Sequence, residues 1–146
     1  MQTNGDNEPW TLFKGGETSP NYLAMVASIR WREQKRNYVM DMQASWSRTN
    51  APMCSPIWLL FPSDAVCAPS TQGDGVCADA IMFGPDYLVK PVTTYQQNSS
   101  WVWLPELPSG QYWTNVFSGE NLGNNAVNIT VATPIDTFPL FMRTYA

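Results

Sequence analysis

The sequence has 146 residues, a formal net charge of −4 and no histidine. One domain with a hydrophobic core fits this length, whereas a complete (β/α)8 barrel needs about 250 residues. The charge gives no reason to expect nucleic acid as a partner, and the lack of histidine excludes Ser-His-Asp and Cys-His mechanisms from this chain and argues against zinc sites. No apolar run approaches the ~20 residues of a membrane span, and the twelve prolines argue against a helical bundle.

A long helix is predicted from residue 20 to about residue 48. Ser19 precedes Pro20, an arrangement typical of a helix N-terminus, and the segment contains no further proline and no glycine. Half of the basic side chains fall within positions 30–36, and we interpret them as the solvated side of this helix. The apolar side chains recur at the three-to-four spacing of an amphipathic helix; they are Tyr22, Met25, Val26, Ile29, Trp31, Tyr38, Val39, Met42 and Trp46.

The rest of the chain is predicted to consist of strands and turns. Residues 52–64, PMCSPIWLLFPSD, read as an extended apolar strand bracketed by prolines, in which the Cys54 thiol is expected to be buried. MFG and YLV, within residues 82–89, predict two strands joined by a Gly-Pro-Asp turn. Residues 101–105 predict another strand. The alternation over 127–131 predicts a half-buried strand with one wet face.

Three tryptophans on these strands, Trp101, Trp103 and Trp113, allow two interpretations. They could form a flat platform on which a sugar stacks, as in carbohydrate-binding modules. Alternatively, they pack in the core, because Trp101 and Trp103 point to the same side of a strand and a sandwich needs one apolar face. We expect core packing.

Several ordered segments resemble glycoside hydrolase family 31, the α-glucosidase and α-xylosidase family. NEPW at 7–10 is similar to the family's E-P-W, and residues 32–38 are similar to its R-x-x-L-x-P-Y pattern. Residues 52–64 resemble P-V-M-R-P-L…F-P-x-D, with Ser55 in the place of the arginine. Residues 79–92 resemble D-Q-F-M-F-G followed by P-LLVAPV, and 101–120 resemble V-Y-L-P and G-x-W-Y-D-F-W-T-G-E. TPIDTFPLFMR at 133–143 is similar to A-P-L-D-x-I-P-L-F-V-R.

The resemblance implies a mainly β chain with N-terminal helices, in which the remnant of a (β/α)8 barrel precedes an incomplete antiparallel β-sandwich. Residues 1–50 would form the last helix region of the catalytic barrel, and 51–146 the proximal C-terminal sandwich. The chain would then pack on its own barrel, encoded upstream of Met1. The apolar stripe of the predicted helix and the open strand edges of the sandwich both predict that the isolated chain is marginally stable and poorly soluble.

The implied activity of the intact parent is hydrolysis of α-glucosidic or α-xylosidic bonds with retention, acting on an α-linked oligosaccharide or glycoside without metal or organic cofactor. The family's two catalytic aspartates lie on earlier barrel strands. Asp41-Met42 lacks the flanking residues of the nucleophile motif W-x-D-M-N-E and sits in a predicted helix, so we assign no catalytic residue here. Glu8 and Trp10 are the candidate substrate-binding residues, although Trp10 equally fits a hydrophobic plug at a helix start.

Two further readings remain open: a stand-alone sugar-binding sandwich without catalysis, and a purely structural module that braces a partner barrel. The sequence leaves the sugar and the linkage undetermined.

Cysteine and asparagine positions bear on the compartment. Cys67 and Cys77 flank a short turn-rich loop that a disulfide could close, and Cys54 is left over. Asn98-Ser99-Ser100 and Asn128-Ile129-Thr130 are N-glycosylation sequons, with Asn128 expected on the outer side of its strand. Together these features favour a secreted or endomembrane parent, while the compartment itself stays open.

Overall fold

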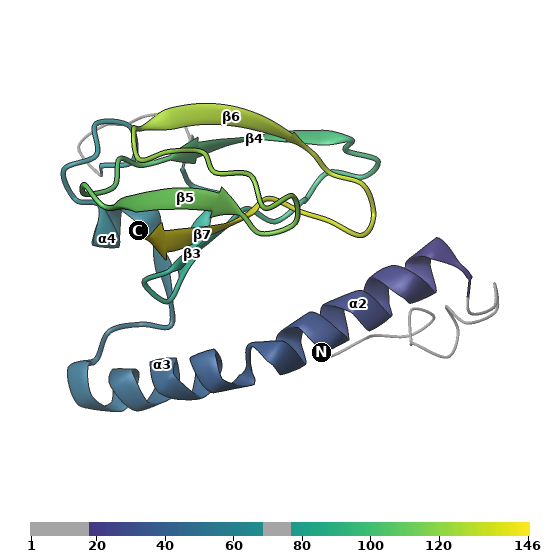
Figure 1. Ribbon diagram of the computed structural model, residues 1–146, viewed down its shortest axis with the longest axis horizontal. Helices are drawn as coiled ribbons and strands as arrows, with labels where there is room; N and C mark the ends of the chain where they lie inside the picture. The colour runs from purple at the N-terminus through teal and green to yellow at the C-terminus, as the bar shows by residue number, and fades with distance from the viewer. Residues whose placement is uncertain (1–17, 69–76) are drawn as a thin grey trace.

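The computed structural model describes residues 18–68 and 77–146 (Figure 1). Two helices come first, α2 (Pro20–Gln34) and α3 (Arg36–Thr49), and a one-turn helix, α4 (Ile57–Leu60), follows the first strand. The strands are β1 (Cys54–Pro56), β2 (Ile81–Phe83), β3 (Tyr87–Val89), β4 (Ser99–Leu104), β5 (Gln111–Asn115), β6 (Val127–Ala132) and β7 (Leu140–Tyr145). Within the described residues no helix is long and apolar enough to cross a membrane.

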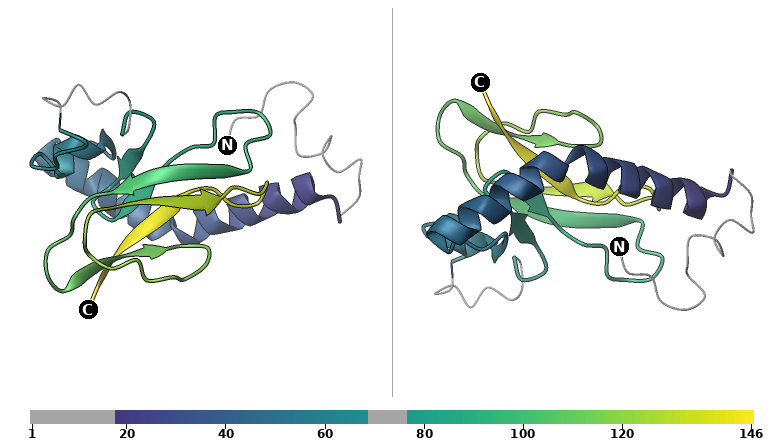
Figure 2. Two further views of the ribbon diagram at one scale, coloured as in Figure 1. Left: turned by 90° about the horizontal axis from the view of Figure 1, so that it is seen from above. Right: turned by 90° about the horizontal axis from the view of Figure 1, so that it is seen from below.

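The strands form two antiparallel sheets that face each other. One has five strands in the order β1-β2-β3-β7-β5, and the other consists of β4 and β6. Figure 1 shows β4 and β6 above the five-stranded sheet and the two long helices below it, and the views in Figure 2 agree. The predicted mainly β fold, with helices preceding an antiparallel sandwich, is therefore confirmed.

The core lies between the two sheets and is closed. Trp113, at the centre of β5, is fully buried, and its indole nitrogen donates a 2.8 Å hydrogen bond to the Pro105 carbonyl oxygen. This bond satisfies the only polar atom that the ring brings into the core. The other fully buried apolar side chains around it come from both sheets and from α4; they include Phe141, Met82, Leu88, Val102, Leu104, Leu107 and Ile57. The prediction that Trp113 packs in the core is correct.

The two long helices differ from the sandwich because neither contains a single buried residue. The predicted helix over residues 20–48 is present, but it is interrupted at Lys35, whose amide contacts the carbonyl oxygens of Trp31 and Arg32. Helix α3 ends where Asn50 adopts a left-handed conformation, φ 56°. Of the nine predicted apolar side chains, Ile29 and Trp46 retain 48% and 51% of their accessible surface, and the other seven are partly buried.

One tyrosine connects the helices to the five-stranded sheet. Tyr38 of α3 donates a 3.0 Å hydrogen bond to the Phe83 carbonyl oxygen, and its hydroxyl accepts one from the Asp86 amide. Its ring meets the Tyr87 ring edge-on, with centroids 5.1 Å apart. Burial raises the pKa of the Tyr38 phenol, because the charged form would lose its hydration. Gly84, φ 61°, turns the β2–β3 hairpin directly beneath this hydroxyl, where a Cβ would overlap it.

Three expectations about the strands were wrong. Residues 57–60 form helix α4 rather than strand, since Pro56 ends β1 and the turn directs Ile57 into the core while Trp58 and Leu59 face outward. Cys54 is exposed, because it lies in a three-residue strand at the edge of the sheet.

The third error concerns Trp101. It is 41% exposed, because β4 turns Ser100, Val102 and Leu104 to the core instead. Trp103 is partly buried and packs against the core, as expected. A period of two fixes which side chains share a face, but it does not fix which of the two faces is buried.

Candidate functional site

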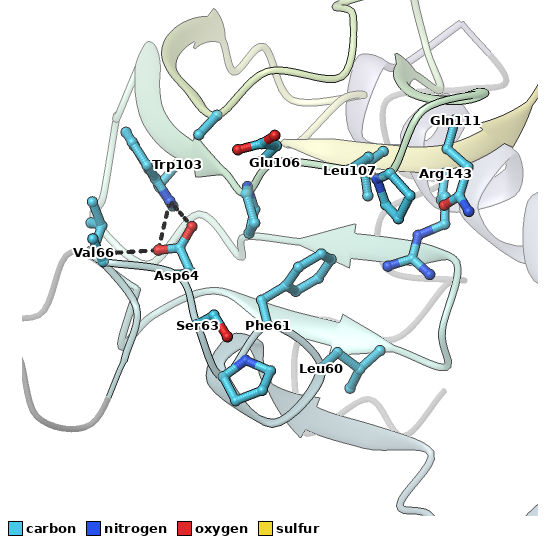
Figure 3. Close-up of a pocket in the computed structure, with 15 residues that line it drawn as sticks. Leu60, Phe61, Ser63, Asp64, Val66, Trp103, Glu106, Leu107, Gln111 and Arg143 are labelled. Atoms are coloured by element: carbon cyan, nitrogen blue, oxygen red, sulfur yellow. Dashed lines mark hydrogen bonds between the residues drawn. The ribbon is translucent and has the colours of Figure 1, made fainter.

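A groove of about 820 Å³ opens at one end of the sandwich (Figure 3). The segment after α4 forms one wall, and the ends of β4, β5 and β7 form the other. Apolar side chains make most of its lining, and polar groups stand at its two ends. The lining residues are Leu60, Phe61, Pro62, Ser63, Asp64, Ala65, Val66, Trp103, Pro105, Glu106, Leu107, Pro108, Gln111, Ala126 and Arg143.

Asp64 organises the acidic end of the groove. One of its carboxylate oxygens accepts hydrogen bonds from the Val66 amide, at 2.9 Å, and the Cys67 amide, at 2.8 Å. The Trp103 indole nitrogen lies 3.1 Å from both carboxylate oxygens. Figure 3 shows the indole pointing down at this carboxylate from β4. Asp64 thereby ties the 61–68 segment to the two-stranded sheet, and its oxygens are committed to that task.

Arg143 and Gln111 form the opposite end. The Arg143 guanidinium carbon lies 5.3 Å from the centroid of the Phe61 ring, a cation–π arrangement that fixes the side chain along the groove floor. The Arg143 Nε and the Gln111 Oε1 are buried and have no hydrogen-bond partner among the described residues. A buried polar atom without a hydrogen-bond partner destabilises the folded state. This end of the groove therefore has hydrogen-bonding capacity that the described residues do not use.

The groove does not have the chemistry of a glycosidase centre. A retaining glycosidase needs one carboxylate free to attack the sugar and a second to donate a proton. Asp64 is held by three donors, and Glu106 stands on an exposed rim. Within residues 18–68 and 77–146, no cluster of side chains could hold a metal ion. The arrangement holds the 61–68 segment against β4 and leaves polar atoms that could bind a polar group.

The predicted site residues fall into three groups. Glu8 and Trp10 lie outside the described residues. Cys67 and Cys77 are joined by a disulfide, with Cα atoms 5.5 Å apart. Asn98 and Asn128 are both exposed, and Asn128 faces outward on β6.

Among the described residues, the structure brings Cys67 and Cys77 together but does not join them with Asn98 or Asn128 in one site. Cys67 does adjoin the groove, since its amide binds Asp64. Sequence reasoning missed the Asp64–Trp103 and Tyr38–Phe83 bonds. Asp64 lies in the FPSD segment, which resembles a family motif. Its partner Trp103 is 39 positions away, however, and a contact at that distance leaves no local pattern in the sequence.

Comparisons with known proteins agree on one family. The family profile described as "Glycosyl hydrolase family 31 C-terminal domain" matches residues 50–146. Among solved structures, a GH31 α-xylosidase from a soil metagenome, complexed with xylose, is 32% identical with a TM-score of 0.78; the match covers 100% of this chain and 19% of that one. A search of curated proteins found no match.

Two further structures share the fold. A GH31 α-xylosidase from Xanthomonas citri is 27% identical, with a TM-score of 0.75, and the match covers 93% of this chain and 13% of that one. A xylosidase from Aspergillus niger is 23% identical, with a TM-score of 0.76, over 92% and 18%. The chain therefore spans a fifth or less of the length of these proteins.

Proposed function

Because the chain belongs to glycoside hydrolase family 31, we propose that it is the part of an α-glycosidase that braces the catalytic barrel and takes no direct part in bond cleavage. The observation that carries the proposal is the contrast between a closed sandwich core and two helices without a buried residue. Residues 1–50 would present the apolar stripe of α2 and α3 to the barrel. Residues 51–146, which correspond closely to the matched profile, would hold those helices in place.

The exposed side of the helices has the composition of a protein–protein contact. Leu23, Ile29, Met40 and Trp46 are each about half exposed or more. These four side chains are spread over both helices, and a surface rich in exposed apolar side chains is typical of one that another part of a protein covers. Tyr38 and Trp31 pack toward the sandwich from the same two helices, so the helices lie between the sheet and that outer surface.

For the whole enzyme we propose hydrolysis of an α-linked glucoside or xyloside with retention of configuration. The support is 32% identity over the full chain to a protein described as an α-xylosidase complexed with xylose. Two carboxylates outside this chain would act as nucleophile and as acid/base, with no metal or organic cofactor. Glu8 and Trp10 are proposed as contacts on the sugar side, since they precede the helix that meets the barrel.

The experiment compares the chain alone with a chimera in which it replaces the matching segment of the metagenomic α-xylosidase. We expect no hydrolysis of an aryl α-xyloside by the chain alone and measurable hydrolysis by the chimera. Charged substitution at an exposed apolar residue of α3, Met40→Glu or Trp46→Glu, should lower the chimera's activity. Gln43→Glu, at an exposed polar position of the same helix, changes the charge by the same amount and is the control. Turnover by the repurified chain alone would contradict the proposal, as would a soluble chimera unaffected by Met40→Glu and Trp46→Glu.

A second candidate function is carbohydrate binding without catalysis, and the exposure of Trp101 favours it. Titration of the chain with α-linked glucose and xylose oligosaccharides tests it. Binding that Trp101→Ala removes and Trp46→Ala preserves would support this function.

A further inference from the structure

The outer face of the β4–β6 pair carries two tryptophans: Trp101 is 41% exposed, and Trp103 is partly buried where its ring packs against the core. By alternation, Ser99, Trp101 and Trp103 share this face of β4, while Ser100, Val102 and Leu104 are buried. On β6, Asn128, Thr130 and Ala132 are exposed, whereas Val127, Ile129 and Val131 pack against the core. Two large indoles on a two-stranded outer face raise the question of what covers them.

The strand register places a glycosylation sequon against these rings. Trp103 is paired directly with Asn128, and Trp101 with Thr130, which are the first and third residues of Asn128-Ile129-Thr130. Directly opposed side chains of an antiparallel pair have Cβ atoms about 4.5–5.5 Å apart. A sugar attached to the Asn128 amide nitrogen would therefore begin within reach of the Trp103 ring.

The Trp103 ring is held in one orientation before any sugar arrives. Its indole nitrogen lies within hydrogen-bond distance of both oxygens of Asp64, and one of those oxygens also accepts hydrogen bonds from the Val66 and Cys67 amides. Trp101 is engaged differently, since the Lys90 ammonium lies 3.9 Å from its ring centroid. A preorganised ring loses little conformational freedom when a ligand packs on it.

We propose that Asn128 is an N-glycosylation site whose first sugar packs against the Trp103 indole and covers the outer face of β4–β6. The transfer requires a polyprenyl-diphosphate-linked oligosaccharide. The Asn128 Nδ2 forms a bond to the anomeric carbon, the bond from that carbon to the diphosphate oxygen breaks, and the amide loses one proton as the polyprenyl diphosphate leaves. No electron is transferred to or from an external group.

Asn98 provides the matched control within the same chain. It is exposed and begins the sequon Asn98-Ser99-Ser100, yet it precedes β4, and its nearest partner across the strands is Thr133, whose amide binds the Asn98 carbonyl oxygen. No described tryptophan is paired with it in the strand register. A glycan at Asn98 would therefore add mass without stacking on an indole.

The experiment begins with secretory expression of the chain in a eukaryotic host and glycopeptide mass spectrometry. We expect Asn128 to be occupied. Nuclear Overhauser contacts should connect the first N-acetylglucosamine with the Trp103 ring protons, a readout that needs no substitution. An unoccupied Asn128, or a first sugar without contacts to Trp103, would overturn the proposal.

Stability measurements supply the second readout. Asn128→Gln should lower the melting temperature by about 3 °C, the shift that one aromatic contact produces in a domain of this size, and Asn98→Gln should lower it by less than about 1 °C. In a Trp103→Leu background, Asn128→Gln should have no further effect, since the cycle isolates the contact between glycan and ring. An equal shift in both backgrounds would overturn the stacking. If Trp103→Leu does not fold, the nuclear Overhauser contacts measured in the unaltered chain test whether the first sugar packs on Trp103.

Discussion

The sandwich and the two long helices come from one chain, but they bury their apolar side chains to very different extents. Trp113, on β5, has no exposed surface, whereas Trp46, on α3, keeps 51% of its own. Amphipathic spacing marks the face of a helix that another surface can cover. Burial, however, requires a second surface, and most stability comes from burial. The difference is the basis of the proposal that the helices are covered by a further part of the protein.

The two regions meet at one small junction. Tyr38 binds the β2–β3 hairpin through its hydroxyl and packs on Tyr87, and Lys35 adds its ammonium 5.2 Å from the Tyr87 ring centroid. Trp31 of α2 also meets the Tyr87 ring edge-on, so both helices contact the five-stranded sheet.

Removing the central ring of the sandwich should have the largest effect. Trp113→Ala is expected to lower the free energy of unfolding by about 3–5 kcal/mol, through lost burial and the cavity left behind. The matched variant Trp46→Ala should change it by less than about 0.5 kcal/mol in the chain alone. Urea denaturation followed by circular dichroism measures both. Similar losses in the two variants would break the distinction between the regions.

The junction should be the next most sensitive point. Gly84→Ala forces a left-handed residue and places a methyl group against the Tyr38 hydroxyl and the Met42 sulfur, so we expect a loss of about 2–4 kcal/mol. Gly110→Ala is the control, because Gly110 also has positive φ, 83°, with nothing within 4 Å. Its loss should be about 1 kcal/mol. Equal losses would mean that Tyr38 does not crowd the hairpin.

The proposed disulfide should contribute to the sandwich alone. Closing the loop between Cys67 and Cys77, 10 positions apart, stabilises the fold by about 2.7 kcal/mol on the chain-entropy model. Reduction should lower the urea midpoint accordingly, while Cys54→Ala, which leaves the pair intact, should not. Mass spectrometry of the alkylated native chain checks the pairing. Two free thiols at these positions would rule it out.

The smallest effect concerns the Tyr38 phenol. Tyr38→Phe should cost about 1 kcal/mol at neutral pH, from the lost bond to Phe83. Because burial raises the folded-state pKa above the usual value near 10, the folded state keeps its proton when the unfolded chain has lost one. The stabilisation that arises from this pKa difference is fully present below about pH 10 and is lost as the pH rises further. The difference in free energy of unfolding between the unaltered chain and Tyr38→Phe should therefore decrease in alkaline solution. A difference that stays constant with pH would contradict a raised pKa of Tyr38 in the folded state.

Much of the fold could be read from local patterns. Pro20 marked the helix start, the alternation over 127–131 marked a strand with one wet face, and Gly84 marked the hairpin turn. These features depend on neighbouring residues, so a sequence contains them. The family resemblance supplied the sandwich and is supported by the profile over 50–146.

What could not be read from the sequence depends on distant partners. The outward orientation of Trp101 depends on which face of β4 meets the five-stranded sheet, and both faces carry apolar side chains. The helical turn at Ile57 depends on the core site that receives this side chain. The bond from Trp103 to Asp64 joins residues 39 positions apart, so no local spacing predicts it.

Amide hydrogen exchange of the chain alone and of the α-xylosidase chimera tests the central claim most directly. In the chain alone, amides of α2 and α3 should exchange much faster than those of β5 and β7, because local stability follows burial. In the chimera, the helix amides should become as protected as the strands. Helices already as protected as the sandwich in the chain alone, with no gain in the chimera, would contradict the proposal that their apolar face is completed by a catalytic barrel.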